Sequence, residues 1–297
     1  MSTLPFLRFP FLPQQEILKN LDLLDVVKLS TLSTRSKTLV QVSKTFQVDN
    51  FYWDLSKNHE RLYIRNGKTV LCALNWLDDR KYNHFFSTIL ELFPVTKFTL
   101  SMDQSFAVQT NPIFEYIRTF ETLYIWNRYD TFDRIPKNDV DFLMDQLTVK
   151  HFEMCASSVE GKYRKPLKHH TLILEDLEWL SLDSILNMTT SCLSADGYMS
   201  LRDKNTVLKK WASGGLENLE TFNIEHYTED GNVLEGIETV EIDAALRPFK
   251  LEYSTRESVK EIKREDGRIA SAVFANDRLK FLVWPINNCS ALDLSLQ

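Results

Sequence analysis

Hydrophobic residues crowd the first part of the chain at a spacing that predicts short helices. The stretch from Phe9 to Val40 reads FPFLPQQEILKNLDLLDVVKLSTLSTRSKTLV. Pro13 suits a first helical turn, where its missing N–H is harmless. Asp22 is the expected N-cap of the second helix, and Ser33 or Thr34 that of the third. We expect three helices, over residues 14–21, 23–32 and 35–43.

These helices carry more apolar side chains than so small a unit can bury. A domain of about 40 residues is usually too small to be held by a single core. The apolar residues of the second helix nearly encircle it, and a helix that is apolar all round is buried on all sides. The neighbouring helices can cover only part of this surface. The remainder must contact either the rest of this chain or another protein.

After residue 45 the helical period gives way to alternating apolar and polar positions. FQVDNFYWDLS and ERLYIRNGKTVLCAL contain runs rich in aromatic and β-branched residues, which favour strands. Asn66-Gly67 is a two-residue hairpin signal between two such runs. This part of the sequence predicts a small antiparallel meander.

From about Asn83 a loose repeat of helix, turn and strand follows. Each predicted strand carries two apolar residues two positions apart. These pairs are Phe98/Leu100, Leu123/Ile125, Phe152/Met154 and Phe222/Ile224. The segment from Leu172 to Ser194 predicts one more such unit, of undefined register. Gly214 and Gly215 end a helix as a C-cap does. Each unit hides its apolar face by stacking on a neighbour, which resembles an irregular leucine-rich-repeat-like solenoid.

The last part of the chain returns to strands. FKLEYS, VKEIKR, RIASAVFA and LKFLVWP alternate in the manner of strands. Asp266-Gly267 and Asn276-Asp277 mark turns between them. We expect a closing meander that covers the edge of the last repeat.

Composition excludes several classes of function. The chain of 297 residues has a net charge of −6, whereas a general nucleic-acid binder needs a basic surface. No apolar stretch reaches the roughly 20 residues of a membrane span. The cysteines are scattered without a CxxC motif, so we expect reduced thiols and a cytoplasmic or nuclear location. We therefore expect no nucleic-acid partner and no membrane partner.

Candidate catalytic and metal-binding residues are scarce. The sequence has no Gly-rich phosphate loop, no GxSxG and no HExxH. His151 and Cys155 have a metal-like spacing only on a helix, and VKHFEMCA predicts a strand. His169 and His170 are adjacent, and we expect both at the surface. We predict no catalytic residues, no metal and no cofactor.

One predicted loop has the composition of a binding surface. YIWNRYDTFDRIP follows a strand, and Trp, Tyr and Arg dominate binding hot spots. The loop either contributes to a substrate-binding surface or folds back onto the solenoid. Its candidate substrate-binding residues are Trp126, Arg128, Tyr129 and Phe132.

The segment of about residues 5–44 resembles the F-box. A Leu-Pro pair, a short helix with Glu16, Ile17 and Leu18, a second Leu-rich helix and the ending LSTLSTRSKTLV occur in the order of that family. The resemblance implies binding to Skp1 and, through it, to a cullin-based ubiquitin ligase. By residue match, the residues that would form or support this contact are Pro10, Leu12, Pro13, Ile17, Leu18, Leu21, Leu24, Val27 and Leu32.

A second resemblance covers about residues 50–285. DKNTVLKKWASGGLENLETFNI and IKREDGRIASAVF resemble the F-box-associated type 2 domain of the nematode-expanded F-box family. Asn205, Leu208, Lys209 and Trp211 match its N-x-x-L-K-x-W segment. The family fixes no substrate-binding residues that would carry over.

Together these observations predict a multidomain protein. A small all-α, three-helix F-box over 1–46 precedes a β meander or linker over 47–80. The F-box-associated, leucine-rich-repeat-like α/β solenoid follows over 81–297, flanked by antiparallel β meanders.

The resemblance implies a non-catalytic, substrate-recognition adaptor of a Skp1-cullin-F-box ubiquitin ligase, with an unknown protein substrate. The alternative is a protein-interaction scaffold without a ubiquitin-ligase role, whose N-terminal helices would cap its own solenoid. An enzyme ranks third, because the catalytic motifs are missing.

Overall fold

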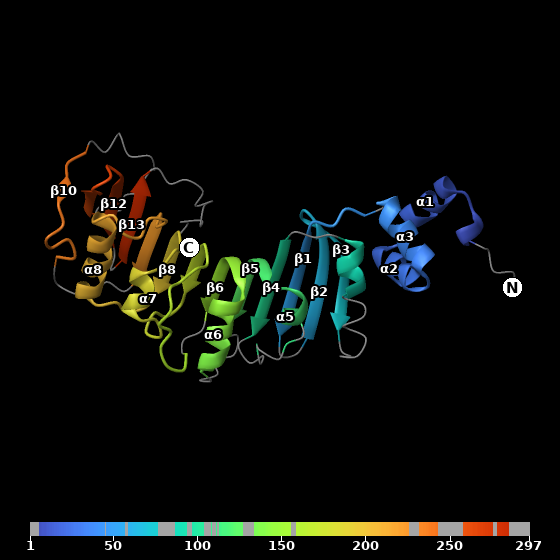
Figure 1. Cartoon of the computed structure of the whole chain (residues 1–297), viewed down its shortest axis with the longest axis horizontal. Helices are drawn as coiled ribbons and strands as arrows, with labels where there is room; N and C mark the ends of the chain where they lie inside the picture. Colours follow the sequence, from blue (N-terminus) through green and yellow to red (C-terminus); the bar gives the residue numbers. More distant parts are fainter. Residues whose placement is uncertain are drawn as a thin grey trace. The chain divides into compact units, whose positions relative to one another are not determined.

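The computed structural model divides into two compact units, Met1–Leu123 and Tyr124–Gln297, which are described in turn (Figure 1). Each unit contains hydrogen-bonded β-strands in both parallel and antiparallel pairs. The residues described are 6–44, 46–56, 59–76, 87–93, 97–103, 108, 111, 113–126, 134–155, 159–225, 232–242, 258–275 and 278–284.

The first unit begins with the expected helices. They are α1 (Phe11–Lys19), α2 (Leu23–Thr31) and α3 (Thr34–Ser43), preceded by the 3-10 turn η1 (Phe6–Arg8). The Asp22 carboxylate accepts a hydrogen bond from the Asp25 N–H at 2.8 Å, and the Ser33 hydroxyl accepts one from the Ser36 N–H at 3.1 Å. Both predicted N-caps are confirmed. The first helix begins three residues earlier than expected, so that Pro13 lies in its first turn.

The strands of the first unit form the predicted meander and one further pairing. They are β1 (Asn50–Ser56), β2 (His59–Asn66), β3 (Thr69–Trp76) and β4 (Lys97–Asp103). β1 pairs antiparallel with β2, and β2 with β3, whereas β1 pairs parallel with β4. A short helix, α5 (Ile113–Tyr116), follows. The alternation along β1 buries Phe51, Trp53 and Leu55 on one face of the sheet.

The hairpin between β2 and β3 lies one residue later than the sequence predicts. Asn66 pairs with Thr69, so the two turn residues are Gly67 and Lys68. The left-handed φ of 56° falls on Gly67, where a glycine has no Cβ to clash. The Asp49 carboxylate accepts a hydrogen bond from the Gly67 N–H at 2.9 Å, which supports the turn. A bulge between Ile64 and Arg65 sets this register, and sequence spacing alone does not show it.

The second unit alternates helices with parallel strands. The strand β5 (Thr119–Trp126) carries the boundary between the units. The parallel neighbours are β6 (Thr148–Cys155), β7 (Thr171–Leu174), β8 (Cys192–Asp196) and β9 (Thr221–Glu225). The helices of this unit are α6 (Lys137–Gln146), α7 (Leu182–Leu186) and α8 (Leu201–Ala212). In Figure 1, α6 and α8 lie in front of the strands.

The predicted strand positions are confirmed, with one refinement. The four pairs of apolar positions lie in β4, β5, β6 and β9. The segment from Leu172 to Ser194 contains most of β7, the helix α7 and most of β8, so it holds two strands where a single helix–strand unit was expected. Gly214, with φ 91°, follows α8 and donates its N–H to the Trp211 carbonyl. This is the C-terminal end that the sequence predicts.

The chain of the second unit closes with antiparallel strands. They are β10 (Thr239–Val240), β11 (Ser258–Lys263), β12 (Ile269–Ala275) and β13 (Arg278–Trp284). β13 pairs antiparallel with β9, so the closing meander continues the sheet beside the last parallel strand. The FKLEYS and Asn276-Asp277 predictions lie outside the described residues.

Candidate functional site

The N-terminal helices bury a small apolar interior. Leu18 of α1 is 0% exposed, as are Val26 and Val27 of α2. Leu23 and Leu39 are also buried. Since these residues come from all three helices, they hold the bundle together.

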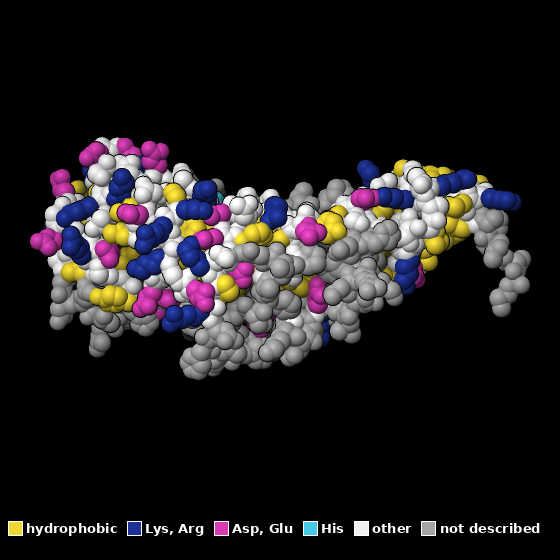
Figure 2. Space-filling model, turned by 60° about the horizontal axis from the view of Figure 1, so that its bottom comes forward, with side chains coloured by type: hydrophobic (Ala, Val, Ile, Leu, Met, Phe, Trp, Pro, Cys, Tyr) yellow, Lys and Arg dark blue, Asp and Glu magenta, His cyan; other side chains and the backbone are white. Residues whose placement is uncertain are grey.

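A second group of apolar side chains on the same helices is open to solvent. Leu12 is 71% exposed, Leu32 75%, Val42 57% and Phe11 42%. These are four of the seven large hydrophobic residues that are exposed in the described part of the chain. Figure 2 shows hydrophobic side chains gathered over these helices. A concentration of this kind is typical of a surface that binds another protein.

The structure distributes the nine residues matched to the F-box over the inside and outside of this bundle. Leu18 and Val27 are buried and support the helices from within. Ile17, Leu21 and Leu24 are half-buried. The exposed members are Pro10, Leu12, Pro13 and Leu32.

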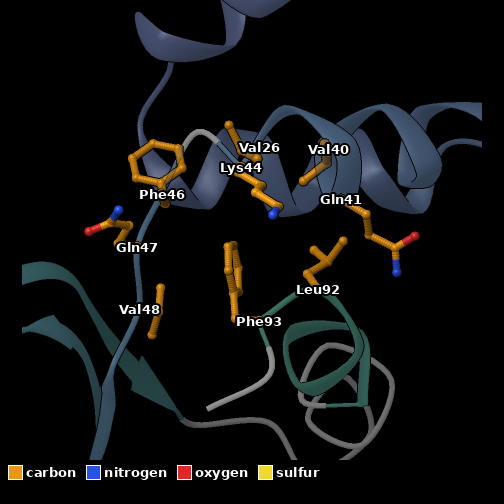
Figure 3. Close-up of a pocket in the computed structure, with 9 residues that line it drawn as sticks. All are labelled: Val26, Val40, Gln41, Lys44, Phe46, Gln47, Val48, Leu92 and Phe93. Carbon is orange, nitrogen blue, oxygen red and sulfur yellow. The ribbon is translucent and has the colours of Figure 1, made fainter.

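The rest of the first unit covers another side of α2 and α3. A cavity of about 340 Å³ lies between Val26 and Val40 of these helices and Phe93 at the end of the helical segment 87–92 (Figure 3). Leu92 faces the same cavity. The Lys37 ammonium forms an ion pair with a carboxylate 54 residues further on, that of Glu91. The apolar surplus of the helices therefore divides between contact with this chain and open surface.

The predicted substrate loop is only partly described. Trp126 ends β5, is half-buried and stacks on Tyr124 with ring centroids 5.7 Å apart and planes at 20°. Arg128, Tyr129 and Phe132 lie outside the described residues. The structure thus places Trp126 at the end of a strand and brings Tyr124 beside it, a neighbour that the sequence did not single out.

The residues of the N-x-x-L-K-x-W segment have mainly structural positions. The Asn205 side chain donates hydrogen bonds to the Val233 and Glu235 carbonyls at 2.6 and 2.9 Å. Leu208 and Trp211 are both 0% exposed. Lys209 alone points to solvent. This segment therefore fastens α8 to the 232–238 loop and the core.

Trp211 also has a cation beside it. The Arg264 guanidinium lies over its ring, 5.6 Å from the centroid, and donates a hydrogen bond to the Gly214 carbonyl. Trp211 also meets Phe281 edge to face, with ring centroids 5.0 Å apart. The contacts join α8, β13 and the turn after β11 into one core.

The groups with catalytic or metal-binding potential are dispersed. His151 and Cys155 lie on β6, as predicted, and no cluster of three His, Cys, Asp or Glu side chains that could hold a metal exists among the described residues. Burial, with the nearby Glu153 carboxylate, raises the pKa of the Cys155 thiol to about 12. Such a thiol is a poor nucleophile near neutral pH.

Cys72 and Cys155 are free thiols. One expectation about an individual side chain is wrong. His169 is 2% exposed and stacks on Phe152 with centroids 5.1 Å apart. Burial lowers the pKa of His169 to about 4, against an opposing effect of nearby backbone groups.

Two family models match the chain, one over the N-terminal helices and one over part of the second unit. The model of the F-box domain matches residues 6–47, which contain α1 to α3. The model described as F-box associated matches residues 163–224, which run from before β7 into β9 and include Asn205 to Trp211. These matches confirm the resemblance to an F-box protein with an F-box-associated type 2 domain. Neither family model indicates a catalytic family.

No curated protein and no solved structure matches the chain.

Within the described part of the chain, every helix is too short or too polar to cross a membrane.

Proposed function

We propose that this protein is a substrate-recognition adaptor of a Skp1-cullin-F-box ubiquitin ligase. The helices α1 to α3 dock on a Skp1-like adaptor, which joins the protein to a cullin. The F-box-associated part binds the protein to be ubiquitinated, for degradation in the cytoplasm or nucleus. The two family matches support the proposal, because they occur in the order that the family uses.

The observation that carries the proposal is the exposed apolar surface of the N-terminal helices. Leu12 and Leu32 are each more than two thirds exposed, at 71% and 75%, although Leu18 and Val27 complete an interior without them. Leaving a large aliphatic side chain in water costs about 1.5–3 kcal/mol relative to burying it. A partner that covers Leu12 and Leu32 gains this free energy on binding. Pro10, Pro13, Ile17, Leu21 and Leu24 complete the proposed contact.

The remainder of the chain is the proposed substrate-binding part. We assign 1–46 to the F-box, 47–80 to a connecting meander and 81–297 to a leucine-rich-repeat-like domain. The strands β6 to β9 are parallel neighbours. The helix α7 connects β7 to β8, and α8 connects β8 to β9, which supports the comparison with a repeat fold. Trp126, Arg128, Tyr129 and Phe132 are the proposed substrate contacts.

The adaptor itself needs no catalytic group. It holds the substrate near the ubiquitin-conjugating enzyme and raises the effective concentration of substrate lysines there.

Co-expression of the full chain with a Skp1-like adaptor tests the proposal. We expect the two proteins to co-purify by affinity tag and to elute together in size-exclusion chromatography. A chain that elutes alone as a monomer would contradict the proposal and favour the interaction scaffold. For the substrate contacts, Trp126→Ala with Tyr129→Ala should lower substrate recovery under proteasome inhibition and leave Skp1 binding unchanged.

A further inference from the structure

The strands of the first unit have a second face, opposite to the one that buries Phe51, Trp53 and Leu55. The strand registers place its side chains in rows across β4, β1 and β2. Asn50 pairs with Lys97 on one side and with Arg65 on the other. Tyr52 pairs with Tyr63 in the next row. In the row after that, Arg61 lies opposite Asp54.

The centre of this face is an arginine held between two tyrosine rings. The Arg65 guanidinium carbon lies 4.7 Å from the centroid of the Tyr52 ring and 5.6 Å from that of Tyr63. The two rings are themselves 5.8 Å apart. The contacts fix the direction of the guanidinium, so little conformational entropy is lost when it binds an anion.

This guanidinium has unused hydrogen-bonding capacity. Its Nε is buried and makes no hydrogen bond among the described residues. A guanidinium presents several N–H donors in a planar fork that matches a carboxylate. Arg65 is thus oriented, partly desolvated and without an acceptor for that donor.

The positive charge of this face is not neutralised within the described part of the chain. Arg61 and Lys97 are exposed, and none of Arg61, Arg65 and Lys97 forms an ion pair with a described carboxylate. Asp54, the carboxylate in these rows, is already engaged by another group. The whole chain, in contrast, carries a net charge of −6. A local excess of cations on an acidic protein selects for an acidic partner.

We propose that this face of β1, β2 and β4, termed the Arg65 face, binds an acidic segment of a partner protein. A glutamate or aspartate of that segment pairs with Arg65, and further carboxylates reach Arg61 and Lys97. The surface lies outside α1 to α3 and needs no Skp1 for binding, so it extends the proposed function without depending on it.

A single-stranded nucleic acid is the less suitable occupant. Proteins that bind single strands stack bases on open aromatic faces. Here the Arg65 guanidinium already lies over both tyrosine rings. A carboxylate needs the edge of the guanidinium and leaves these stacking contacts in place.

Fluorescence anisotropy with the full-length chain tests the proposal. The probe is a labelled peptide of alternating Glu and Ser, and its control is the same peptide with Gln in place of Glu. We expect the Glu peptide to bind, the Gln peptide to bind at least about tenfold more weakly, and added salt to weaken the binding. Arg65→Lys keeps the charge but removes the planar fork and should weaken binding.

Exposed residues keep the test informative even if Arg65→Lys disturbs the fold. Arg61→Gln with Lys97→Gln should weaken Glu-peptide binding about tenfold and leave the melting temperature unchanged. Lys68→Gln in the nearby turn and Arg202→Gln on α8 remove the same charge elsewhere and should have little effect.

The proposal is overturned if the Glu and Gln peptides bind equally, or if Lys68→Gln and Arg202→Gln weaken binding as much as the Arg61/Lys97 variant. Tighter binding of oligouridylate than of the Glu peptide would overturn it in favour of a nucleic acid. Co-purification of the Arg61/Lys97 variant with Skp1 separates this proposal from the adaptor function. Whether Skp1 binding is lost or retained tests the adaptor function alone.

Discussion

Gln41 of α3 donates a hydrogen bond through its side-chain Nε2 to the backbone carbonyl of Glu91, over 3.2 Å and 50 residues of sequence. The carboxylate of the same Glu91 forms an ion pair with the Lys37 ammonium, which also belongs to α3. Phe93, two residues further on, is 7% exposed and lies against the cavity below α2 and α3. The N-terminal helices are therefore fastened to the segment before β4 by both polar and apolar contacts.

We predict that Phe93→Ala loosens this junction. Truncating a buried phenylalanine costs about 3–5 kcal/mol, so the connection after α3 should open more often. Tryptic cleavage after Lys44, the exposed C-cap residue that follows α3, should become faster. Val42→Ala, which removes an exposed side chain from the same helix, is the control. Equal cleavage rates for wild type and Phe93→Ala would show that the junction does not depend on this contact.

Removing the N-cap of α2 should destabilise that helix. Asp22→Ala removes the acceptor of the Asp25 N–H, at a cost of about 1 kcal/mol. Hydrogen exchange of the amides in the first turn of α2 should accelerate correspondingly. Asp22→Ser keeps an acceptor and should exchange nearly as wild type. Unchanged exchange in Asp22→Ala would contradict the assigned cap.

Asn205 should contribute to stability far more than its neighbour in the same motif. Asn205→Ala removes two hydrogen bonds to backbone carbonyls, each worth about 1 kcal/mol. Lys209→Ala removes an exposed side chain and should change stability by less than about 0.5 kcal/mol. Chemical denaturation of both variants checks this difference. Similar losses for the two variants would mean that the motif is not structural in the way described.

His169 should make the second unit less stable in acid. Its folded-state pKa of about 4 lies below the ordinary value of 6.5, so the unfolded state takes up a proton first as the pH falls. The free energy of unfolding should be at its full value above about pH 6.5. Between pH 6.5 and about pH 4 it should fall by up to about 3 kcal/mol because of this group.

The control for this pH dependence is His169→Phe, which keeps an aromatic ring beside Phe152. Thermal melting between pH 7 and pH 4 should show a smaller loss of stability for the variant than for wild type. If both lose the same amount, another group is responsible for the pH dependence.

The features that depend on neighbouring residues could be predicted from the sequence. The caps at Asp22 and Ser33 lie within one turn of the helices they begin, and the strand positions follow from alternation. Contacts between distant segments could not be predicted in this way. The burial of His169 depends on Phe152, and the Arg65 face depends on a parallel pairing between β1 and β4, which no local pattern encodes.

The candidate site was predictable in kind but not residue by residue. The surplus of apolar residues on the N-terminal helices is visible in the sequence. The sequence does not show which of these residues contact the rest of the chain and which stay exposed. Val26 faces a cavity that Phe93 also lines, whereas Leu12 and Leu32 are exposed to solvent. Helical periodicity shows which residues share a face, but not which face the rest of the chain covers.

The affinity of the purified full-length chain for a Skp1-like adaptor tests the central claim most directly. Leu12→Asp and Leu32→Asp place a charge on side chains that are 71% and 75% exposed, so both variants should fold. Each should weaken binding by about 2 kcal/mol, or roughly thirtyfold. Val70→Asp on β3, where the wild-type side chain is 46% exposed, should bind as wild type. Equal affinity of Leu12→Asp, Leu32→Asp and wild type would contradict the account.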